Sequence, residues 1–186
     1  MRIVAGEFRG RTLAALGKGD EGAHLRPTAD RVREALFNML AGGRFGEPFG
    51  GAFVLDLFAG TGALGLEALS RGAEQVTFVD DGRVAQGLIK SNVAALAVRD
   101  RVRLLTCSAL RLPATETAAT LVFLDPPYGK GLGARALASA RAAGWIAPGT
   151  LVVWEENAEQ AAPDGFALLE TRSYGDTVVT VLEATA

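Results

Sequence analysis

The chain has 186 residues, of which 49% are hydrophobic and 22% are charged, and its formal net charge is −2. This composition fits one globular domain with a substantial apolar core, and the charge argues against a uniformly basic nucleic-acid-binding protein. No apolar run approaches the roughly 20 residues that a membrane span needs, so we expect a cytoplasmic protein with no membrane partner.

One cysteine and one histidine limit the possible chemistry. Cys107 cannot form an internal disulfide, and His24 cannot join it in a useful metal cluster. A zinc enzyme and a Ser-His-Asp hydrolase are therefore both disfavoured, and we expect no metal. No coiled-coil pattern requires an oligomer, so we expect a monomer.

Charge is distributed unevenly along the chain. Residues 1–50 carry eight Arg or Lys residues against six Asp or Glu residues, which leaves residues 51–186 with a net charge of −4. A basic front on an acidic body suits a polyanion that is contacted on one face. The alternative is that these arginines form a solvated edge that keeps the protein soluble.

Two elements are predicted at the front of the chain. Residues 2–13, "RIVAGEFRGRTL", alternate in polarity and carry two glycines, which predicts a small hairpin that displays Arg2, Arg9 and Arg11. Residues 26–40, "RPTADRVREALFNML", have the apolar spacing of an amphipathic helix. The predicted inner stripe of this helix is Val32, Ala35, Leu36, Met39 and Leu40.

From residue 53 onward, strand-like and helix-like segments alternate, which is typical of a parallel sheet covered by helices. Strands are predicted at residues 53–57, 75–80, 101–106, 120–125 and 150–155. Helices are predicted at residues 64–71, which Gly72 terminates, at 83–97 and near 132–143. The inner face of the second of these helices is predicted to be Val84, Leu88, Val93 and Leu96.

The last segment, "FALLETRSYGDTVVTVLEA", contains two strand-like runs joined by a tight turn at Tyr174, Gly175 and Asp176. We therefore predict an α/β fold with a mostly parallel seven-stranded sheet that ends in an antiparallel hairpin. This outline is typical of class I, Rossmann-like methyltransferases, whereas a nicotinamide domain continues with parallel strands. We expect one domain over residues 1–186, with an N-terminal extension (1–50) and a core (51–186).

A glycine loop follows the first strand of this core. Gly60, Gly62 and Gly65 spell G-x-G-x-x-G, and Asp80 falls where a carboxylate could bind ribose hydroxyls. Asp56, just before the loop, would oppose the pyrophosphate of a dinucleotide, but it would favour the sulfonium and ammonium of S-adenosylmethionine. Asp56 could also be a cap that accepts hydrogen bonds from nearby backbone amides.

The segment "FLDPPYGKG" follows the fourth strand, at the edge where open α/β sheets bind ligands. Pro126 and Pro127 remove two N–H donors, so the turn presents carbonyl and carboxylate acceptors that suit an amine. Asp125 and the Pro126 carbonyl could bind the two hydrogens of an exocyclic amine and direct its lone pair at a methyl group. Tyr128 would stack on the base.

These motifs carry a family resemblance. The D-P-P-Y motif and the upstream F-A-G-T-G loop resemble the S-adenosylmethionine-dependent amino-methyltransferases. Together with "LRPTADRVREALFNML" and "RIVAGEFRGRTL", they resemble the RsmD-type methyltransferases of guanine N2 in small-subunit (16S) ribosomal RNA. The resemblance covers nearly the whole chain, and it implies S-adenosylmethionine as cofactor and small-subunit ribosomal RNA, within an assembling subunit, as partner.

The resemblance also implies roles for individual residues. The implied catalytic residues are Asp125, Pro126, Pro127 and Tyr128. The implied cofactor contacts are Asp56, Phe58, Gly60, Gly62, Asp80, Asp81, Ser108, Ala109 and Asp125. The implied RNA contacts are Arg9, Arg11, Arg26 and Arg31. The chain departs from the family at Ser108, where relatives often place an Asn or Asp that contacts the adenine amine.

Three alternatives stay open at this point. An adenine-N6 methyltransferase on RNA or DNA would use the same turn, although the short basic front disfavours DNA. A nicotinamide-dependent oxidoreductase would use the glycine loop and Asp80. A non-catalytic RNA-binding factor could have kept the fold, although the intact motifs argue against this.

Overall fold

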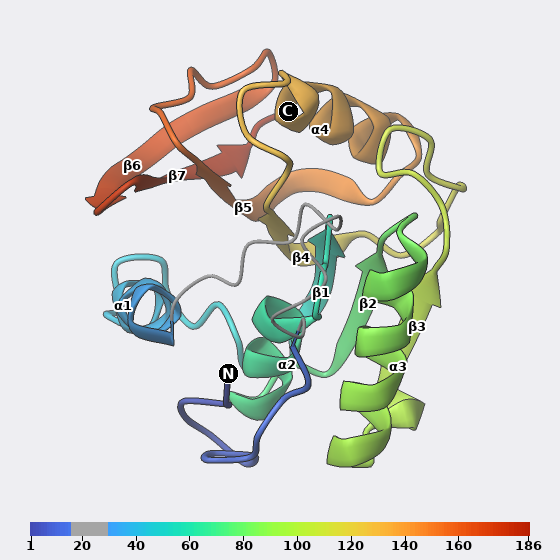
Figure 1. Ribbon diagram of the computed structural model, residues 1–186. Coiled ribbons are helices and arrows are strands. Elements are labelled where there is room, and N and C mark those ends of the chain that lie inside the picture. The colour runs from blue at the N-terminus through green and yellow to red at the C-terminus, as the bar shows by residue number, and fades with distance from the viewer. Residues whose placement is uncertain (16–29) are drawn as a thin grey trace.

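The computed structural model describes residues 1–15 and 30–186, apart from the side chain of Asp30, and its centre is one seven-stranded sheet (Figure 1). The strands are β1 (Phe53–Leu57), β2 (Gln75–Val79), β3 (Val102–Leu105), β4 (Ala119–Leu124), β5 (Ile146–Glu156), β6 (Phe166–Tyr174) and β7 (Thr177–Ala184). Their order in the sheet is β3-β2-β1-β4-β5-β7-β6. Strands β1 to β5 are parallel, and β7 is antiparallel to β5 and β6, which confirms the predicted fold class.

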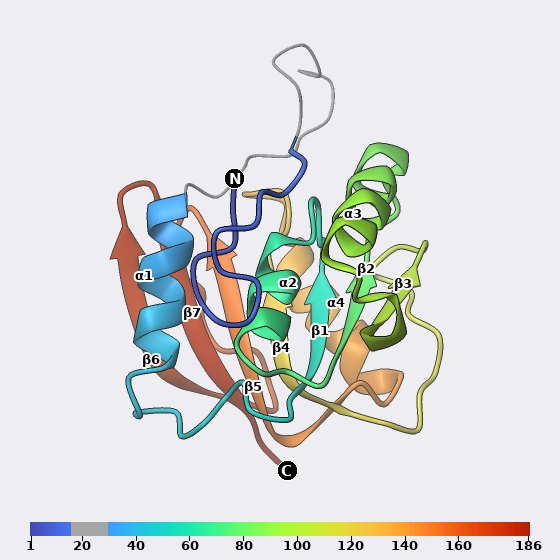
Figure 2. The same cartoon turned by 90° about the horizontal axis from the view of Figure 1, so that it is seen from below.

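Helices cover both faces of this sheet. The described helices are α1 (Asp30–Leu40), α2 (Ala63–Ser70), α3 (Arg83–Leu96), the 3-10 turn η1 (Arg99–Arg101) and α4 (Leu132–Ala142). Helices α1, α2 and α3 lie on one face and α4 lies on the other (Figure 2). None of the helices described is both long enough and apolar enough to span a membrane.

Strand β1 shows why its sequence is an unbroken apolar run. Val54 is buried in the core shared with α1, α2 and α3, whereas Leu55 and Leu57 are buried in the core shared with α4. Successive side chains of a strand point to opposite faces, so a central parallel strand needs apolar residues at nearly every position.

The inner face of α3 differs from the prediction at two of its four residues. Val93 and Leu96 are buried as predicted, but Val84 is 44% exposed and Leu88 is only partly buried. The other buried residues of α3 are Ala85, Ile89 and Asn92. The prediction missed Ala85 and Asn92 because one is small and the other is polar, and it placed Val84 and Leu88 rather than Ile89 on the inner face.

Helix α1 places Leu36 and Leu40 in the core, as predicted, while the other residues of the predicted stripe are only partly buried. The structure adds two fully buried residues that the stripe did not include, Arg33 and Phe37. Burial of an arginine on a helix requires partners, which the N-terminal extension and α2 provide.

Residues 2–12 form the predicted small hairpin. Arg2 and Thr12 make an antiparallel bridge, and the N–H of Ile3 donates to the carbonyl oxygen of Arg11 at 2.9 Å. Arg2, Arg9 and Arg11 are all exposed on it, as predicted. The hairpin therefore displays its arginines while its backbone is closed on itself.

The hairpin packs against the second half of α2. The carboxylate of Glu67 accepts the N–H groups of Val4 and Ala5 at 2.8 and 3.1 Å. Gly6 lies so close to α2 that a Cβ atom there would be 1.7 Å from the carbonyl oxygen of Ser70, and its φ is +79°. Only glycine fits this contact without displacing the backbone.

Glu67 is also the centre of a buried ion group. Its carboxylate lies 2.9 Å from Nε of Arg71 and 3.9 Å from Nε of Arg33. The guanidinium of Arg33 donates to the carbonyl oxygen of Arg2, and the guanidinium of Arg71 lies over the ring of Phe37, 5.0 Å from its centroid. One carboxylate thus ties α1, α2 and the hairpin together.

We expect the variant Glu67→Ala to lose about 3–5 kcal/mol of unfolding free energy, because it removes a buried carboxylate that faces two arginines and accepts two backbone N–H groups. Urea denaturation measures this loss. Glu34→Ala, which changes an exposed residue of α1, is the control and should change stability by less than about 0.5 kcal/mol. Equal stabilities of the two variants would contradict the role given to Glu67.

Candidate active site

The carboxyl ends of three neighbouring strands meet at one edge of the sheet. The last residue of β1 pairs with the last residues of β2 and β4. Asp80 directly follows β2, Asp125 directly follows β4, and Asp56 is the penultimate residue of β1. The parallel sheet therefore brings together the three predicted acidic residues, at the edge where open α/β folds bind ligands.

The glycine loop leaves β1 at this edge and leads into α2. Gly60 has a φ of +57° and Gly62, the N-cap of α2, has a φ of +76°, so both adopt the left-handed conformation that glycine permits. Phe58 is one of two non-glycine residues with positive φ in the described part of the chain, at +58°. Such conformations gather at ligand sites, where the surrounding structure holds them.

Two carboxyl groups hold this loop through its backbone. Oδ2 of Asp80 accepts the N–H of Gly60 at 2.9 Å, and its Oδ1 accepts the N–H of Gly82 at 2.8 Å. Oδ2 of Asp56 accepts the N–H of Gly65 at 2.9 Å. The capping role that the sequence left open for Asp56 is therefore present.

The third glycine of the motif allows close packing rather than an unusual turn. A Cβ atom on Gly65 would lie 2.5 Å from the ring of Phe78 and 2.7 Å from Cγ1 of Val76. Helix α2 can therefore approach β2 closely only with glycine at this position. This contact fixes the start of α2, and with it the glycine loop, against the sheet.

Burial raises the pKa values of the three carboxyl groups at this edge. Burial raises the pKa of Asp56 from 3.8 to about 8, against the effect of its bond from Gly65, and the charge of Asp80 adds to the rise. The pKa of Asp125 is raised by burial and then by the carboxylates of Glu155, Asp56 and Glu156. The pKa of Asp80 is raised by burial, against two backbone hydrogen bonds.

The turn Asp125-Pro126-Pro127-Tyr128 starts beside the glycine loop. The N–H of Asp125 donates to the carbonyl oxygen of Leu57, the last residue of β1, at 3.3 Å. Pro126 is buried, and the other residues of the turn are partly buried. The predicted catalytic turn and the predicted cofactor loop are therefore adjacent.

Two acidic residues that the sequence analysis did not single out support this turn. The hydroxyl of Tyr128 donates to Oε1 of Glu155 at 3.0 Å, and the N–H of Gly129 donates to Oε1 of Glu156 at 3.3 Å. Burial and the charge of Glu155 raise the pKa of the Tyr128 hydroxyl, which stays a hydrogen-bond donor. The sequence could have indicated these two residues, because Glu155 and Glu156 end a long apolar strand, just as Asp80 and Asp125 follow the ends of β2 and β4.

The remaining predicted cofactor contacts lie around the ends of β2 and β3. Asp81 is exposed and follows Asp80, Ser108 is partly buried, and Ala109 is 3% exposed. The hydroxyl of Ser108 accepts the N–H of Leu110 at 3.3 Å. These residues belong to the same edge of the sheet as the glycine loop, because β3 is parallel to β2.

The structure describes three of the four predicted RNA-contacting arginines, Arg9, Arg11 and Arg31. Arg9 is exposed at the closed end of the hairpin, which packs on the end of α2, and Arg31 is exposed on α1. Arg11 is exposed, but its guanidinium also donates to the carbonyl oxygen of Ala95 in α3. Arg26 lies outside the described residues.

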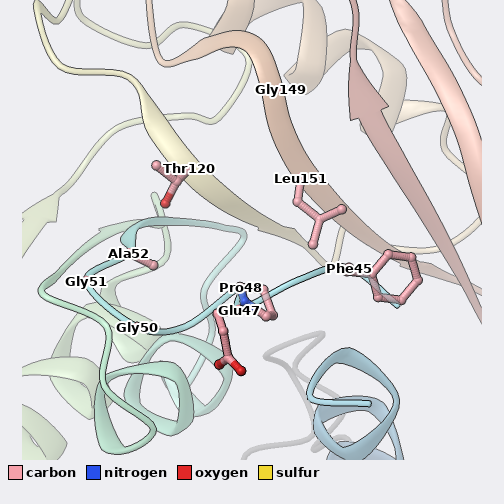
Figure 3. Close-up of a pocket in the computed structure, with 9 residues that line it drawn as sticks. All are labelled: Phe45, Glu47, Pro48, Gly50, Gly51, Ala52, Thr120, Gly149 and Leu151. Carbon is pink, nitrogen blue, oxygen red and sulfur yellow. The ribbon is translucent and has the colours of Figure 1, made fainter. Parts of the chain in front are cut away.

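A shallow pocket of about 270 Å³ lies at the opposite edge of the sheet (Figure 3). It lies where β1 and β4 begin, between Ala52, Thr120 and Leu151, so it shares no residue with the predicted site. Within residues 1–15 and 30–186, no group of three His, Cys, Asp or Glu side chains could hold a metal ion.

The variant Asp56→Asn should weaken the pH dependence of stability. It keeps an acceptor for the N–H of Gly65 but removes a group whose pKa rises from 3.8 to about 8 on folding. The raised pKa means that the protein without cofactor loses unfolding free energy between about pH 4 and pH 8, as a buried carboxyl must ionise. Urea unfolding across this range should show a smaller loss in Asp56→Asn.

Asp164→Asn changes an exposed carboxylate and is the matched control. It should follow the pH profile of the wild type. Parallel profiles for Asp56→Asn and the wild type would contradict the raised pKa of Asp56.

Known proteins resemble this chain over most of its length. The family described as "Conserved hypothetical protein 95" matches residues 1–183. Ribosomal RNA small subunit methyltransferase D of Escherichia coli is 40% identical over 165 residues, which cover 88% of this chain and 78% of that protein. The protein of the same name from Haemophilus influenzae is 35% identical over 182 residues, covering 94% and 89% of the two chains.

Solved structures agree with these relatives. The structure of yhhF from Escherichia coli, described as a candidate methyltransferase, superposes with a TM-score of 0.81 at 33% identity, covering 100% of this chain and 98% of that one. A candidate methylase from Haemophilus influenzae superposes with a TM-score of 0.77 at 29% identity, covering 100% and 98%. The chain therefore belongs to the RsmD family of methyltransferases.

Proposed function

We propose that this chain transfers a methyl group from S-adenosylmethionine to the exocyclic N2 amine of a guanine in small-subunit (16S) ribosomal RNA, within an assembling subunit. The observation that carries the proposal is the 3.3 Å hydrogen bond from Asp125 to Leu57, which sets the amine-binding turn beside the glycine loop. The names of the relatives from Escherichia coli and Haemophilus influenzae support the RNA substrate.

The acidic edge supports the choice of cofactor. Burial and the charge of Asp80 raise the pKa of Asp56, and burial and the charges of Glu155, Asp56 and Glu156 raise that of Asp125, so these carboxyl groups repel one another wherever they ionise. A pyrophosphate would add to this charge and be opposed, whereas a positively charged group would relieve it. S-adenosylmethionine supplies, when bound, a methyl group on a positively charged sulfur together with an ammonium group.

Different residues of this edge would contact different parts of the cofactor. The loop of Phe58, Gly60 and Gly62 would contact it through backbone groups at the start of α2. Asp80 would accept from the ribose hydroxyls, because each of its oxygens bonds one amide and has a lone pair left. Asp56 is only 1% exposed, so we assign it an action through its charge and through its hold on α2. Asp81, Ser108 and Ala109 would lie along the adenosine.

The turn binds and orients the substrate amine. The Asp125 carboxylate and the Pro126 carbonyl accept from its two hydrogens, and the prolines offer no competing N–H. The nitrogen lone pair, otherwise conjugated with the ring, then points at the methyl carbon. The cofactor, when bound, would supply the methyl group and retain its sulfur as a neutral thioether, and the nitrogen would release one proton. The Asp125 carboxylate, which would bind one of these hydrogens, could accept this proton.

Tyr128 is oriented to contact the base of the substrate. Its hydroxyl is held by Glu155 at 3.0 Å, so the position of its ring is set before any substrate binds. We assign this ring the role of stacking on a base that has left its helix or loop. Adenine N6 would fit the same acceptors, and the guanine assignment rests on the family rather than on the turn.

The RNA would bind along the face that carries the hairpin and α1. Arg9 and Arg31 are exposed on this face, and α2, in the same layer, starts at the glycine loop of the acidic edge. This arrangement lets arginines hold phosphates while one nucleotide reaches the turn. Arg11 would contribute less, since its guanidinium also binds the end of α3.

We expect Asp125→Ala to lose about 10²–10³-fold in methyl transfer to small-subunit particles, as when one positioned polar group is removed from an active site. Its affinity for S-adenosylmethionine, measured by calorimetry, should stay near that of the wild type. Asp176→Asn changes an exposed carboxylate in the β6–β7 turn and should leave both quantities unchanged. Loss of cofactor binding in Asp125→Ala would show that Asp125 is structural.

Arg9→Gln should weaken RNA binding and reduce the slope of log affinity against log salt by about 0.7 to 0.9, the value for one lost phosphate contact. Filter binding at several salt concentrations measures this slope. Arg135→Gln removes an exposed charge from α4, on the other face of the sheet, and is the control. An unchanged slope in Arg9→Gln would show that Arg9 is a solvated surface residue that contacts no RNA.

A further inference from the structure

Asn92 joins two segments that lie far apart in the sequence. It lies on the buried face of α3, where its side chain is 1% exposed among Ala85, Ile89 and Val93. Its Oδ1 accepts the N–H of Ala14 at 2.7 Å. Its Nδ2 donates to the carbonyl oxygens of Ala14 at 3.2 Å and Thr61 at 2.9 Å.

These three bonds determine which residue can stand at this position. An asparagine amide has two N–H donors and one carbonyl acceptor, and Asn92 uses both donors and the acceptor on backbone groups. An aspartate would set a carboxylate against two carbonyl oxygens, and an apolar residue would leave three backbone groups without this partner. The side-chain amide of Asn92 therefore satisfies the backbone groups of Ala14 and Thr61 at the same time.

One neighbour belongs to the predicted cofactor loop. Thr61 stands between Gly60 and Gly62, so the bond from Asn92 fixes the peptide group between the two left-handed glycines. The loop is held independently at Gly60 by Asp80. Asn92 is therefore not required merely to keep the loop at the edge of the sheet.

The other neighbour belongs to the N-terminal extension. Ala14 follows the hairpin, whose closed end is already held by Glu67 and Ser70 of α2. Asn92 instead holds the far end of this segment, beside the glycine loop. The glycine loop and the N-terminal segment are therefore each held by other residues, and Asn92 bonds to both of them.

We infer that Asn92 is a positioning residue that couples cofactor binding in the glycine loop to the order of the RNA-contacting N-terminal extension. The inference rests on the proposed function. Cofactor contacts that fix the peptide of Thr61 also fix the amide of Asn92, and thereby the backbone of Ala14. Because such coupling is reciprocal, RNA bound to the extension tightens cofactor binding by the same factor.

Hydrogen exchange of residues 1–15, measured with and without saturating S-adenosylmethionine and without RNA, tests the inference. In the wild type, the cofactor should slow exchange at Ala14 by about fivefold or more, within the usual range of coupling between sites. In Asn92→Asp this protection should disappear. Asn38→Asp, which makes the same change at an exposed position of α1, should keep it.

The reciprocal measurement is the affinity for S-adenosylmethionine with and without saturating small-subunit particles. The wild type and Asn38→Asp should bind the cofactor about fivefold or more tightly with the particles, and Asn92→Asp should show no difference. Asn92→Ala serves as the second variant if Asn92→Asp does not fold. Equal coupling in the wild type and a folded Asn92 variant would overturn the inference, as would a wild type without coupling.

Failure of the proposed function would look different. In that case the wild type would not bind S-adenosylmethionine in calorimetry, or would transfer no methyl group to the particles. Cofactor binding and methyl transfer by a wild type without protection at Ala14 would reject the role of Asn92 alone.

Discussion

The parallel pairing of β1 with β2 and β4 is the constraint on which the site depends, because it brings Asp56, Asp80 and Asp125 to one edge of the sheet. These carboxyl groups lie in a partly or fully buried environment that raises their pKa values, and they act on one another. Their charges are costly in the protein alone. A ligand that carries positive charge would relieve this cost, and the cofactor that we propose, S-adenosylmethionine, carries such a charge.

Helix α2 connects this edge to the N-terminal extension. Its first turn receives the glycine loop, which Asp56 holds through Gly65, and its last turns carry Glu67 and Ser70, which hold the hairpin. The predicted cofactor loop and the predicted RNA-contacting segment are thus attached to the two ends of one short helix. Asn92 joins them a second time through α3. A few buried polar side chains therefore attach the N-terminal extension to the core of the fold.

The fold and the acidic strand ends could be predicted from the sequence, because buried parallel strands are unbroken apolar runs and Asp80 and Asp125 directly follow two of them. The turn residues could be predicted because Pro126 and Pro127 directly follow a strand and its Asp, and they remove two N–H donors from the turn. Local patterns could not reveal the buried polar residues. Arg33, Glu67 and Asn92 appear as solvent-facing positions of helices, and their partners include backbone groups 31 to 78 residues away. Which arginines contact RNA depends likewise on tertiary packing.

The most direct measurement of the central claim uses S-adenosylmethionine labelled on its methyl group and small ribosomal subunits isolated from cells that lack this protein. After incubation with the wild type, the RNA is digested to nucleosides and the labelled nucleoside is identified by its mass and chromatographic mobility. Label in N2-methylguanosine, at one stoichiometric position of the 16S RNA, is the result that the site and the family predict. Label in N6-methyladenosine, label on protein, or no transfer would contradict the account.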